Sequence, residues 1–204
     1  MTIYVAVIAD VIGSRELAPA RRARLQRDLR HALPDLNRLW ERDLAARFAI
    51  TLGDELQCLL KHARAAWDVT HAIRRTFDTV DWVVACGRGA LTTPIPRGAT
   101  APELDGPCFH AARAAVEQGK TDRQVLAFGG FANPALDALA RYYSALYWSW
   151  TRRQRRAATA WRWTAPTGGR VRENPSALSH LKRRVAWPLV QEGDRMFRSL
   201  LEDA

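Results

Sequence analysis

Apolar positions in the first 130 residues form five short runs or alternations, separated by segments with helical spacing. Runs of β-branched and alternating apolar residues predict strands, and apolar residues three and four apart predict amphipathic helices. Strands are predicted at residues 3–10, 47–52, 55–60, 81–91 and 123–128. Helices are predicted at residues 18–40, 63–77 and 105–120, with Pro34 as a break or kink in the first. The expected order is β-α-β-β-α-β-α-β.

The pattern changes after Gly130, where Gly129-Gly130 and Asn133-Pro134 interrupt the chain. Strand signals are scarce beyond this point, and residues 136–150, 151–165 and 175–187 all have helical spacing. Ser176 is placed to cap the last of these helices. We therefore predict two domains, 1–130 and 131–204.

Asp10 and Asp54 are the first candidates for chemistry. Asp10 ends the first strand, and Gly53-Asp54 is a hairpin-turn signal between the second and third strands. If the first two strands are parallel, with the third antiparallel between them, Asp10 lies beside that turn. Two close carboxylates favour a cation, and Mg²⁺ prefers carboxylates together with phosphate oxygens. The alternative is an ordinary acidic turn, with Asp10 capping a helix.

Ser14 and Arg15 follow Asp10 in the segment DVIGSR. Backbone N–H groups here, with the hydroxyl and the guanidinium, could contact a phosphate. A nucleotide held with Mg²⁺ is therefore the ligand that this half of the sequence suggests. Glu55 starts the next strand and is expected to point to the other side of the pleat from Asp54, in a secondary role.

Composition favours a folded protein. The chain has 204 residues, of which 48% are hydrophobic, and three cysteines without a CxxC pair. That pattern is typical of reduced thiols rather than a disulfide framework or a zinc site. No targeting segment or stretch long enough to cross a bilayer is visible, so a soluble, cytoplasmic protein is expected.

Charge points to a polyanionic partner. The formal net charge is +10, and residues 133–204 hold 13 basic and 6 acidic residues. Residues 151–184 alone hold ten basic residues and one acid, Glu173. Such a cluster suits a nucleic-acid backbone, although a solvated arginine-rich face is the plainer reading.

The segments VIADVIG and TLGDEL resemble the palm-like catalytic domain of class III nucleotidyl cyclases and GGDEF diguanylate cyclases. The chain also resembles the SatD-like family through VIADVIGSREL, FAITLGDELQCLL, DGPCFHAARAA and SWTRRQRRAA…PSALSHLKRR. The resemblance implies an α+β fold, a ferredoxin-like or cyclase-like palm whose antiparallel-rich sheet has helices on one face. It also implies a following all-α winged-helix or helix-turn-helix-like domain.

The resemblance to cyclases assigns metal binding to Asp10 and Asp54 and offers Arg113 as a phosphate-steadying, catalytic candidate. Class III cyclases usually carry Asn-x-x-x-Arg on this helix, but Phe109 and His110 stand where the asparagine would lie. Losing a transition-state donor typically costs two to three powers of ten in rate. The domain is thus expected to bind a nucleotide without cyclising it efficiently.

The C-terminal region resembles a helix-turn-helix, with segment 165–174 between two helices. Leu178, Leu181 and Val185 are expected to face the core. The expected DNA contacts follow the usual use of serine and histidine for bases or phosphates and of arginine and lysine for phosphates. They are Arg152, Arg153, Arg155, Arg156, Ser176, Ser179, His180, Lys182, Arg183 and Arg184.

Three functions are compatible with the sequence. The first is a DNA-binding regulator whose palm-like domain binds a nucleotide with Mg²⁺. The second is a Mg²⁺-dependent nucleotidyl cyclase or nucleotidyltransferase. The third is a non-enzymatic dimeric interaction module, for which the aromatic segment YYSALYWSW offers a homodimer surface.

Overall fold

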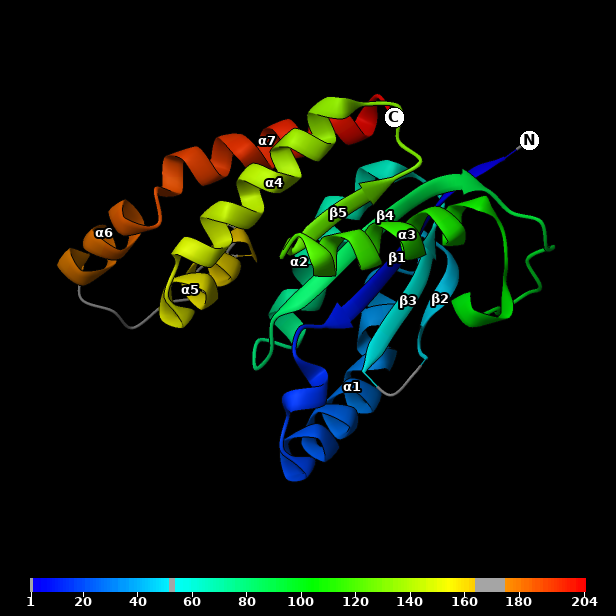
Figure 1. Ribbon diagram of the computed structural model, residues 1–204, viewed down its shortest axis with the longest axis horizontal. Coiled ribbons are helices and arrows are strands. Elements are labelled where there is room, and N and C mark those ends of the chain that lie inside the picture. The colour runs from blue at the N-terminus through cyan, green and yellow to red at the C-terminus, as the bar shows by residue number, and fades with distance from the viewer. Residues whose placement is uncertain (1, 52–53, 164–174) are drawn as a thin grey trace.

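The computed structural model describes residues 2–51, 54–163 and 175–204. Its first part is a five-stranded mixed sheet with the strand order β2-β3-β1-β4-β5 (Figure 1). The elements of this part follow the predicted order of strands and helices. They are β1 (Ile3–Val11), α1 (Pro19–Leu39), β2 (Leu44–Ile50), β3 (Glu55–Leu60), α2 (Ala66–Thr76), β4 (Trp82–Ala90), α3 (Pro107–Thr121) and β5 (Leu126–Gly129).

The predicted pairing of the first three strands is confirmed. β3 lies between β1 and β2 and is antiparallel to both, which makes β1 and β2 parallel to each other. β4 pairs with the other edge of β1 in antiparallel register, and β5 is parallel to β4. The turn between β2 and β3 includes Leu52 and Gly53, which lie outside the described residues. Thr51 N donates to Glu55 O at 2.9 Å across it.

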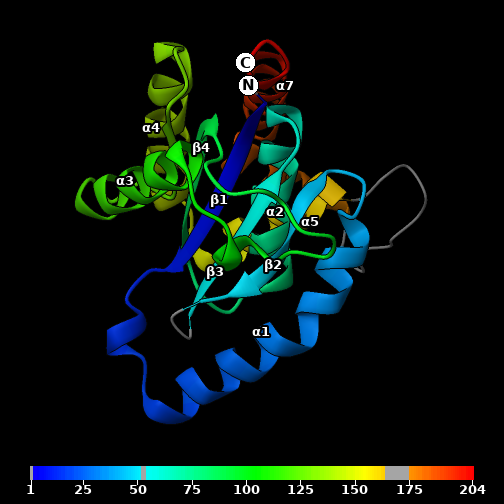
Figure 2. The same cartoon turned by 90° about the vertical axis from the view of Figure 1, so that its right-hand side faces the viewer.

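Helices cover both faces of the sheet, so the expectation of helices on one face is wrong. β1 is apolar at successive positions, and both of its faces are buried. Val5 and Val7 contribute to the core cluster that also contains residues of α1, α2, α4, α5 and α7. Ala6 and Ile8 contribute to a second cluster with α3. The mixed α+β class holds, and α1 packs beside β2 (Figure 2).

α3 lies unusually close to the sheet. A Cβ atom on Gly87 of β4 would stand 2.1 Å from the carbonyl oxygen of Cys108, and one on Gly129 would stand 2.4 Å from that of Ala111. Only glycine fits at these two positions, because any side chain would overlap the helix backbone. This contact fixes the height of α3 over β4 and β5.

Two helical details differ from the prediction. α1 continues through Pro34, because Leu25, Leu29 and Leu36 are buried on either side of it and their packing holds the helix across the lost hydrogen bond. The chain also ends in a helix that was not among those predicted. The C-terminal helices are α4 (Pro134–Ser149), α5 (Arg152–Trp163), α6 (Pro175–Arg184) and α7 (Trp187–Glu202).

The helices after Gly130 share the core of the sheet. Phe197 of α7 stacks on Trp67 of α2 with ring centroids 3.9 Å apart, and Tyr143 of α4 meets the same indole edge-on. Arg198 pairs with Asp68 at 2.6 Å. The division into 1–130 and 131–204 as separate domains stays a prediction. The predicted turn at 165–174 lies wholly outside the described residues, and the winged-helix or helix-turn-helix assignment stays a prediction.

Candidate functional site: a charged cleft at the end of β1

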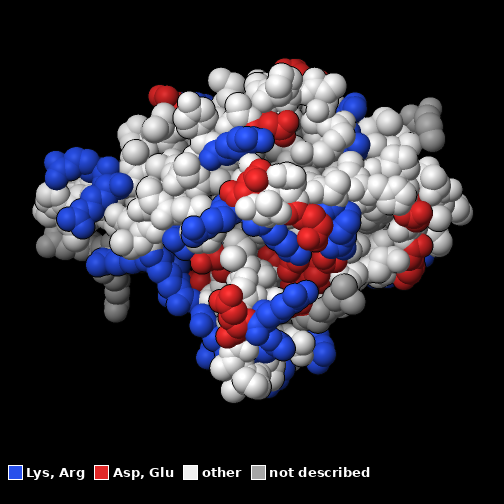
Figure 3. Space-filling view, in the orientation of Figure 1, with Lys and Arg blue, Asp and Glu red and all other residues white. Residues whose placement is uncertain are grey.

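A cleft of about 990 Å³ opens where β1 ends, beside the first residues of β3 and along α3. Asp10, Ser14, Arg15, Asp54 and Arg113 all line it. The structure therefore brings together every residue that the sequence suggested for metal and nucleotide binding. Acidic and basic side chains also lie next to each other in the middle of the face that Figure 3 shows.

Asp10 sits directly opposite Glu55 in the antiparallel ladder of β1 and β3. Directly opposed residues point to the same face of a sheet, which here is the face under α3. Glu55 is therefore the cross-strand partner of Asp10. The expectation that it points away from Asp54 is wrong, because both residues line the cleft. Asp54 precedes the strand, lines the same cleft and lies within electrostatic reach of Asp10.

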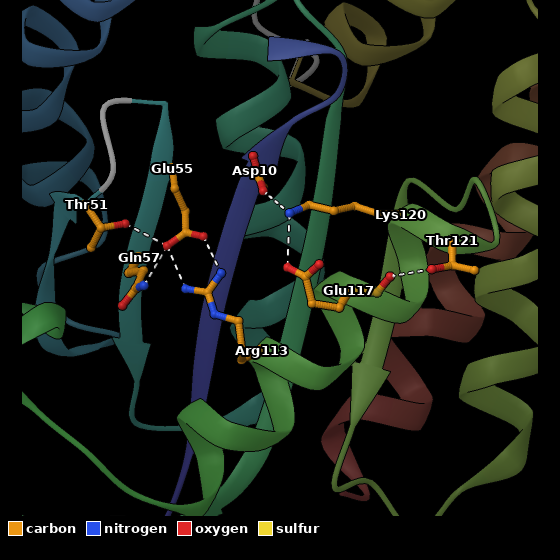
Figure 4. A network of polar contacts seen from close by, with 8 residues as sticks. All are labelled: Asp10, Thr51, Glu55, Gln57, Arg113, Glu117, Lys120 and Thr121. Atoms are coloured by element: carbon orange, nitrogen blue, oxygen red, sulfur yellow. Dashed lines mark hydrogen bonds and ion pairs between the residues drawn. The ribbon is translucent and has the colours of Figure 1, made fainter. Parts of the chain in front are cut away.

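Glu55 is held in a dense set of hydrogen bonds (Figure 4). Its carboxylate accepts from both terminal nitrogens of Arg113, at 2.5 and 2.8 Å, and from Thr51 Oγ1 at 2.6 Å and Gln57 Nε2 at 2.7 Å. The residue is only 3% exposed. Burial alone would raise the pKa of Glu55, but the hydrogen bonds, with that from Arg113 foremost, hold it below the usual value.

Asp10 forms an ion pair with Lys120, whose Nζ also contacts Glu117 Oε1 at 3.1 Å (Figure 4). Burial raises the pKa of Asp10, and the charges of Glu55 and Asp54 add to the rise, while Lys120 opposes it. Lys120 itself is 40% exposed and extends from α3 along the wall of the cleft. Each of the two opposed carboxylates thus holds one cation from the same helix.

Lys120 was missed by the sequence reasoning. The signal was present, since Lys120 follows Arg113 by seven residues and so lies on the same face of α3, two turns away. Ser14 and Arg15, the candidates for phosphate contact, line the same cleft. Gly13 has φ 68°, and Ser14–Glu16 form a single 3₁₀ turn that is held by Arg22, which donates to the carbonyls of Ser14 and Arg15 at 2.9 and 3.1 Å.

His110 and Phe109 stand near the position of the missing asparagine but do not line the cleft. His110 Nε2 lies 3.0 Å from Asp105 Oδ1 and is largely exposed, while Phe109 is buried in the core under α3. Arg113 is therefore the residue of this stretch that faces the cleft. The chemistry available there is binding of a phosphate-bearing anion by cations, with carboxylates that suit a hard divalent ion.

The structure splits the predicted DNA contacts into two groups. On α5, Arg152 donates to Thr79 O at 2.6 Å, Arg155 pairs with Asp81 at 3.0 Å and Arg156 pairs with Asp78 at 3.0 Å. These guanidiniums join α5 to the α2–β4 loop. Arg153 is exposed and also has a partner within the chain.

The second group is on α6, at one end of the molecule, where lysine and arginine side chains gather (Figure 3). Leu178 and Leu181 are half-buried and Val185 is buried, as expected for the inner face. The predicted contacts of this helix are all exposed. They are Ser176, Ser179, His180, Lys182, Arg183 and Arg184.

Among residues 2–51, 54–163 and 175–204, no group of three or more His, Cys, Asp and Glu side chains is arranged to hold a metal ion. In the same ranges, no helix has the length and apolar character needed to cross a membrane.

Comparison with known proteins gives a family but no close relative. No curated protein and no solved structure matches this chain significantly. The sequence profile of the SatD family matches residues 4–124, which include nearly all of β1, the whole of β2, β3, β4, α1, α2 and α3, and most of the residues that line the cleft. The chain therefore belongs to the SatD family.

Proposed function

We propose that this protein is a DNA-binding regulator that binds a nucleotide with Mg²⁺ in the cleft at the end of β1. The observation that carries the nucleotide part is that Asp10, Ser14, Arg15, Asp54 and Arg113 line one cavity. Candidates separated by up to about 100 positions in the sequence converge there.

The carboxylates of the cleft could supply part of the coordination shell of Mg²⁺. The negative charges of Glu55 and Asp54 raise the pKa of Asp10, so a divalent cation beside Asp10 would relieve repulsion. Mg²⁺ commonly takes one or two carboxylates and completes its octahedron with water and phosphate oxygens. Asp10 and Asp54 would hold the ion, and its charge would neutralise a triphosphate. Arg15, Ser14 and Arg113 would contact the phosphate groups.

Calorimetric titration with each nucleoside triphosphate, with and without Mg²⁺, tests this part. Binding that requires Mg²⁺ and falls at least tenfold in Asp10→Asn and Asp54→Asn is expected. Asp137→Asn is the matched control, because Asp137 is exposed on α4, away from the cleft. If no nucleotide binds, or if all three variants bind equally, the nucleotide site is not in this cleft.

The DNA part rests on α6, whose exposed face carries Ser176, Ser179 and His180 beside three consecutive basic residues. A helix with such a face, following another helix, is what a helix-turn-helix-like or winged-helix reader needs. Binding of the protein to its own upstream DNA, measured by fluorescence anisotropy, should weaken in Arg183→Ala/Arg184→Ala. It should also fall steeply with salt.

A variant of an α5 arginine serves as the comparison for the α6 variant. Arg156→Ala removes a pair with Asp78 and is expected to change DNA affinity less than the α6 variant does. Equal losses in both variants would instead favour the predicted clamp of Arg152, Arg153, Arg155 and Arg156 on the DNA backbone. No DNA binding at low salt would exclude the DNA-binding function.

A Mg²⁺-dependent nucleotidyl cyclase or nucleotidyltransferase is the second candidate, favoured by the opposed carboxylates of Asp10 and Glu55 and by Arg113, which contacts Glu55 in the cleft. In that reading, Arg113 steadies the phosphate at which the reaction occurs. Incubation with nucleoside triphosphates and Mg²⁺ or Mn²⁺ tests it. Product that persists in Asp10→Ala and Asp54→Ala would exclude this mechanism.

A dimeric interaction module is the third candidate. Tyr142 on α4 is 78% exposed, and Leu189 and Met196 on α7 are more than half exposed. The surface over α4 and α7 is largely uncharged in Figure 3. Sedimentation of the wild type and of Tyr142→Glu would show whether two copies associate through this surface.

A further inference from the structure

The Lys120 ammonium lies beside the oxygen of Asp10 that would receive a divalent cation. It contacts Asp10 Oδ2 and, at 3.1 Å, Glu117 Oε1 (Figure 4). An ammonium and a divalent cation cannot share one carboxylate oxygen at close range without strong repulsion. Lys120 therefore competes with the metal for Asp10 in the ligand-free protein.

The second carboxylate is engaged in a similar way. Glu55 is held by both terminal nitrogens of Arg113 and by two further hydrogen bonds, so it offers little to an incoming ion. Within the described residues, no group of three potential ligands is ready to hold a metal. A metal that binds alone therefore finds the carboxylates of Asp10 and Glu55 already paired with cationic side chains.

A phosphate-bearing ligand that arrives without a metal is repelled by the acidic residues of the cleft. Asp10, Asp54, Glu55, Glu16 and Glu117 line the cleft, and their charges oppose an anion that arrives alone. The cleft also holds cations that an anion would attract. They are Arg15, Arg22, Arg113, Lys120 and Arg123.

We infer that Lys120 makes the metal and the phosphate-bearing ligand bind as one unit, so that neither binds well alone. When a phosphate oxygen accepts hydrogen bonds from Lys120, the ammonium leaves Asp10 and the carboxylate becomes free for the metal. The metal in turn neutralises the carboxylates that would repel the phosphate. Only the side chain has to move, because α3 is fixed on the sheet by its contact with Gly87.

This inference deepens the proposed nucleotide site and rests on it. It names Lys120 as the residue that selects ligands, and it gives their class as metal-bound di- or triphosphates rather than free cations or free monophosphates. Because coupling between two ligands is reciprocal, the metal must raise phosphate affinity by the same factor as phosphate raises metal affinity.

Calorimetry with three titrants tests the inference: Mn²⁺ alone, inorganic pyrophosphate alone, and the two premixed. The wild type should bind the premixed pair much more tightly than either component. Lys120→Gln keeps the length of the side chain nearly unchanged and removes its charge. It should bind Mn²⁺ alone about tenfold or more tightly than the wild type does, the size of effect that an adjacent charge exerts on a carboxylate. It should also lose most of the gain from pyrophosphate.

Lys61→Gln is the matched control, since Lys61 lies at the other end of β3 and donates to Arg42 O. It should behave as the wild type does, and melting temperatures will show that both variants fold. Unchanged Mn²⁺ affinity in Lys120→Gln, with the premixed pair still preferred, would overturn the role of Lys120 and leave the nucleotide site standing. If no titrant binds the wild type in a way that Asp10→Asn abolishes, the site itself is wrong, and the role of Lys120 falls with it.

Discussion

Arg113 and Glu55 form a bidentate ion pair in the cleft. Glu55 is nearly inaccessible to water, whereas the Arg113 side chain is 41% exposed. The pair therefore stabilises the protein mainly by satisfying a buried carboxylate. The same arginine is offered as a phosphate ligand, so binding and stability are linked at this residue.

We predict that Arg113→Ala lowers the free energy of unfolding by about 1–3 kcal/mol, because it leaves a buried carboxylate without its bidentate donor. The pKa of Glu55 is lower in the folded protein than its ordinary value of 4.5. This stabilisation is therefore complete above pH 4.5 and is lost as the pH falls below that value. In urea unfolding between pH 3 and pH 6, the free energy of unfolding should fall more steeply with decreasing pH in the wild type than in Glu55→Gln. Equal slopes would contradict the assignment.

His71 on α2 is fully enclosed among Trp67 and Tyr143. Neither of its ring nitrogens has a hydrogen-bond partner in the described parts of the chain. Burial, assisted by the charges of Arg162, Arg74 and Arg198, lowers the pKa of His71 well below 6.5. The folded protein thus keeps this imidazole neutral at a pH where the unfolded chain would protonate it.

The wild type should therefore lose stability as the pH falls below about 6.5, by up to about 1.4 kcal/mol per pH unit from this residue alone. His71→Phe should flatten the slope of stability between pH 6.5 and pH 5, measured by urea unfolding. His31→Gln, at an exposed position of α1, is the control and should leave the slope as it is. A slope that persists unchanged in His71→Phe would show that other groups cause it.

At the scale of elements, the cleft depends on how closely α3 approaches the sheet. Arg113 and Lys120 reach Glu55 and Asp10 only because small residues line the contact between α3, β4 and β5. Gly87 and Gly129 permit that approach, and Ala112 is fully buried against it.

We predict that Gly87→Ala destabilises the protein by about 1–3 kcal/mol, because the new methyl group would overlap the backbone of Cys108 and Ala112 and force α3 outward. Gly193→Ala is the matched control. A Cβ there meets nothing within 4 Å, and it sits inside α7, where alanine should stabilise by about 0.5–1 kcal/mol. Opposite shifts in melting temperature are expected. A neutral Gly87→Ala would mean that α3 can move freely over the sheet.

The sequence predicted the sheet well because its strands carry strong local signals. The run Ile3–Val11 is apolar except near its end, at Asp10, and Glu55–Leu60 is flanked by a turn signal, so both strands were located within a residue. The convergence of Asp10 with the β2–β3 turn followed from topology alone. Helices on the second face of the sheet were not foreseen, although the unbroken apolar run of β1 required cover on both sides.

The site was harder to predict in its details. Which acid faces Asp10 depends on the register of β1 and β3, and a shift of one residue exchanges Asp54 for Glu55. Lys120 and Arg113 can reach the two acids because α3 lies close to the sheet. That close approach depends on glycines of β4 and β5, which are distant in the sequence. The ion pairs of Arg155 and Arg156 with the α2–β4 loop likewise arise from long-range packing that a charge count does not contain.

At the scale of the whole molecule, the C-terminal helices complete the core that the sheet begins. Trp67 is 1% exposed because Phe197 and Tyr143 cover it. Arg162 lies buried between these aromatic rings and pairs with Asp194 of α7 at 2.8 Å. Nucleotide binding in the cleft and DNA binding at α6 would therefore occur on one cooperatively folded body, with α4 and α5 between them (Figure 1).

This arrangement predicts that the two parts do not unfold separately. Phe197→Ala should lower the free energy of unfolding by about 3–5 kcal/mol, the usual loss for a large aromatic side chain in a core. Because the core is shared, hydrogen exchange should accelerate in β1 and β3 as well as in α7. A fragment of residues 1–130 should lack a cooperative thermal transition, since it would expose Trp67. If the fragment melts cooperatively, and if Phe197→Ala leaves exchange in β1 and β3 unchanged, the boundary near Gly130 divides two independent domains after all.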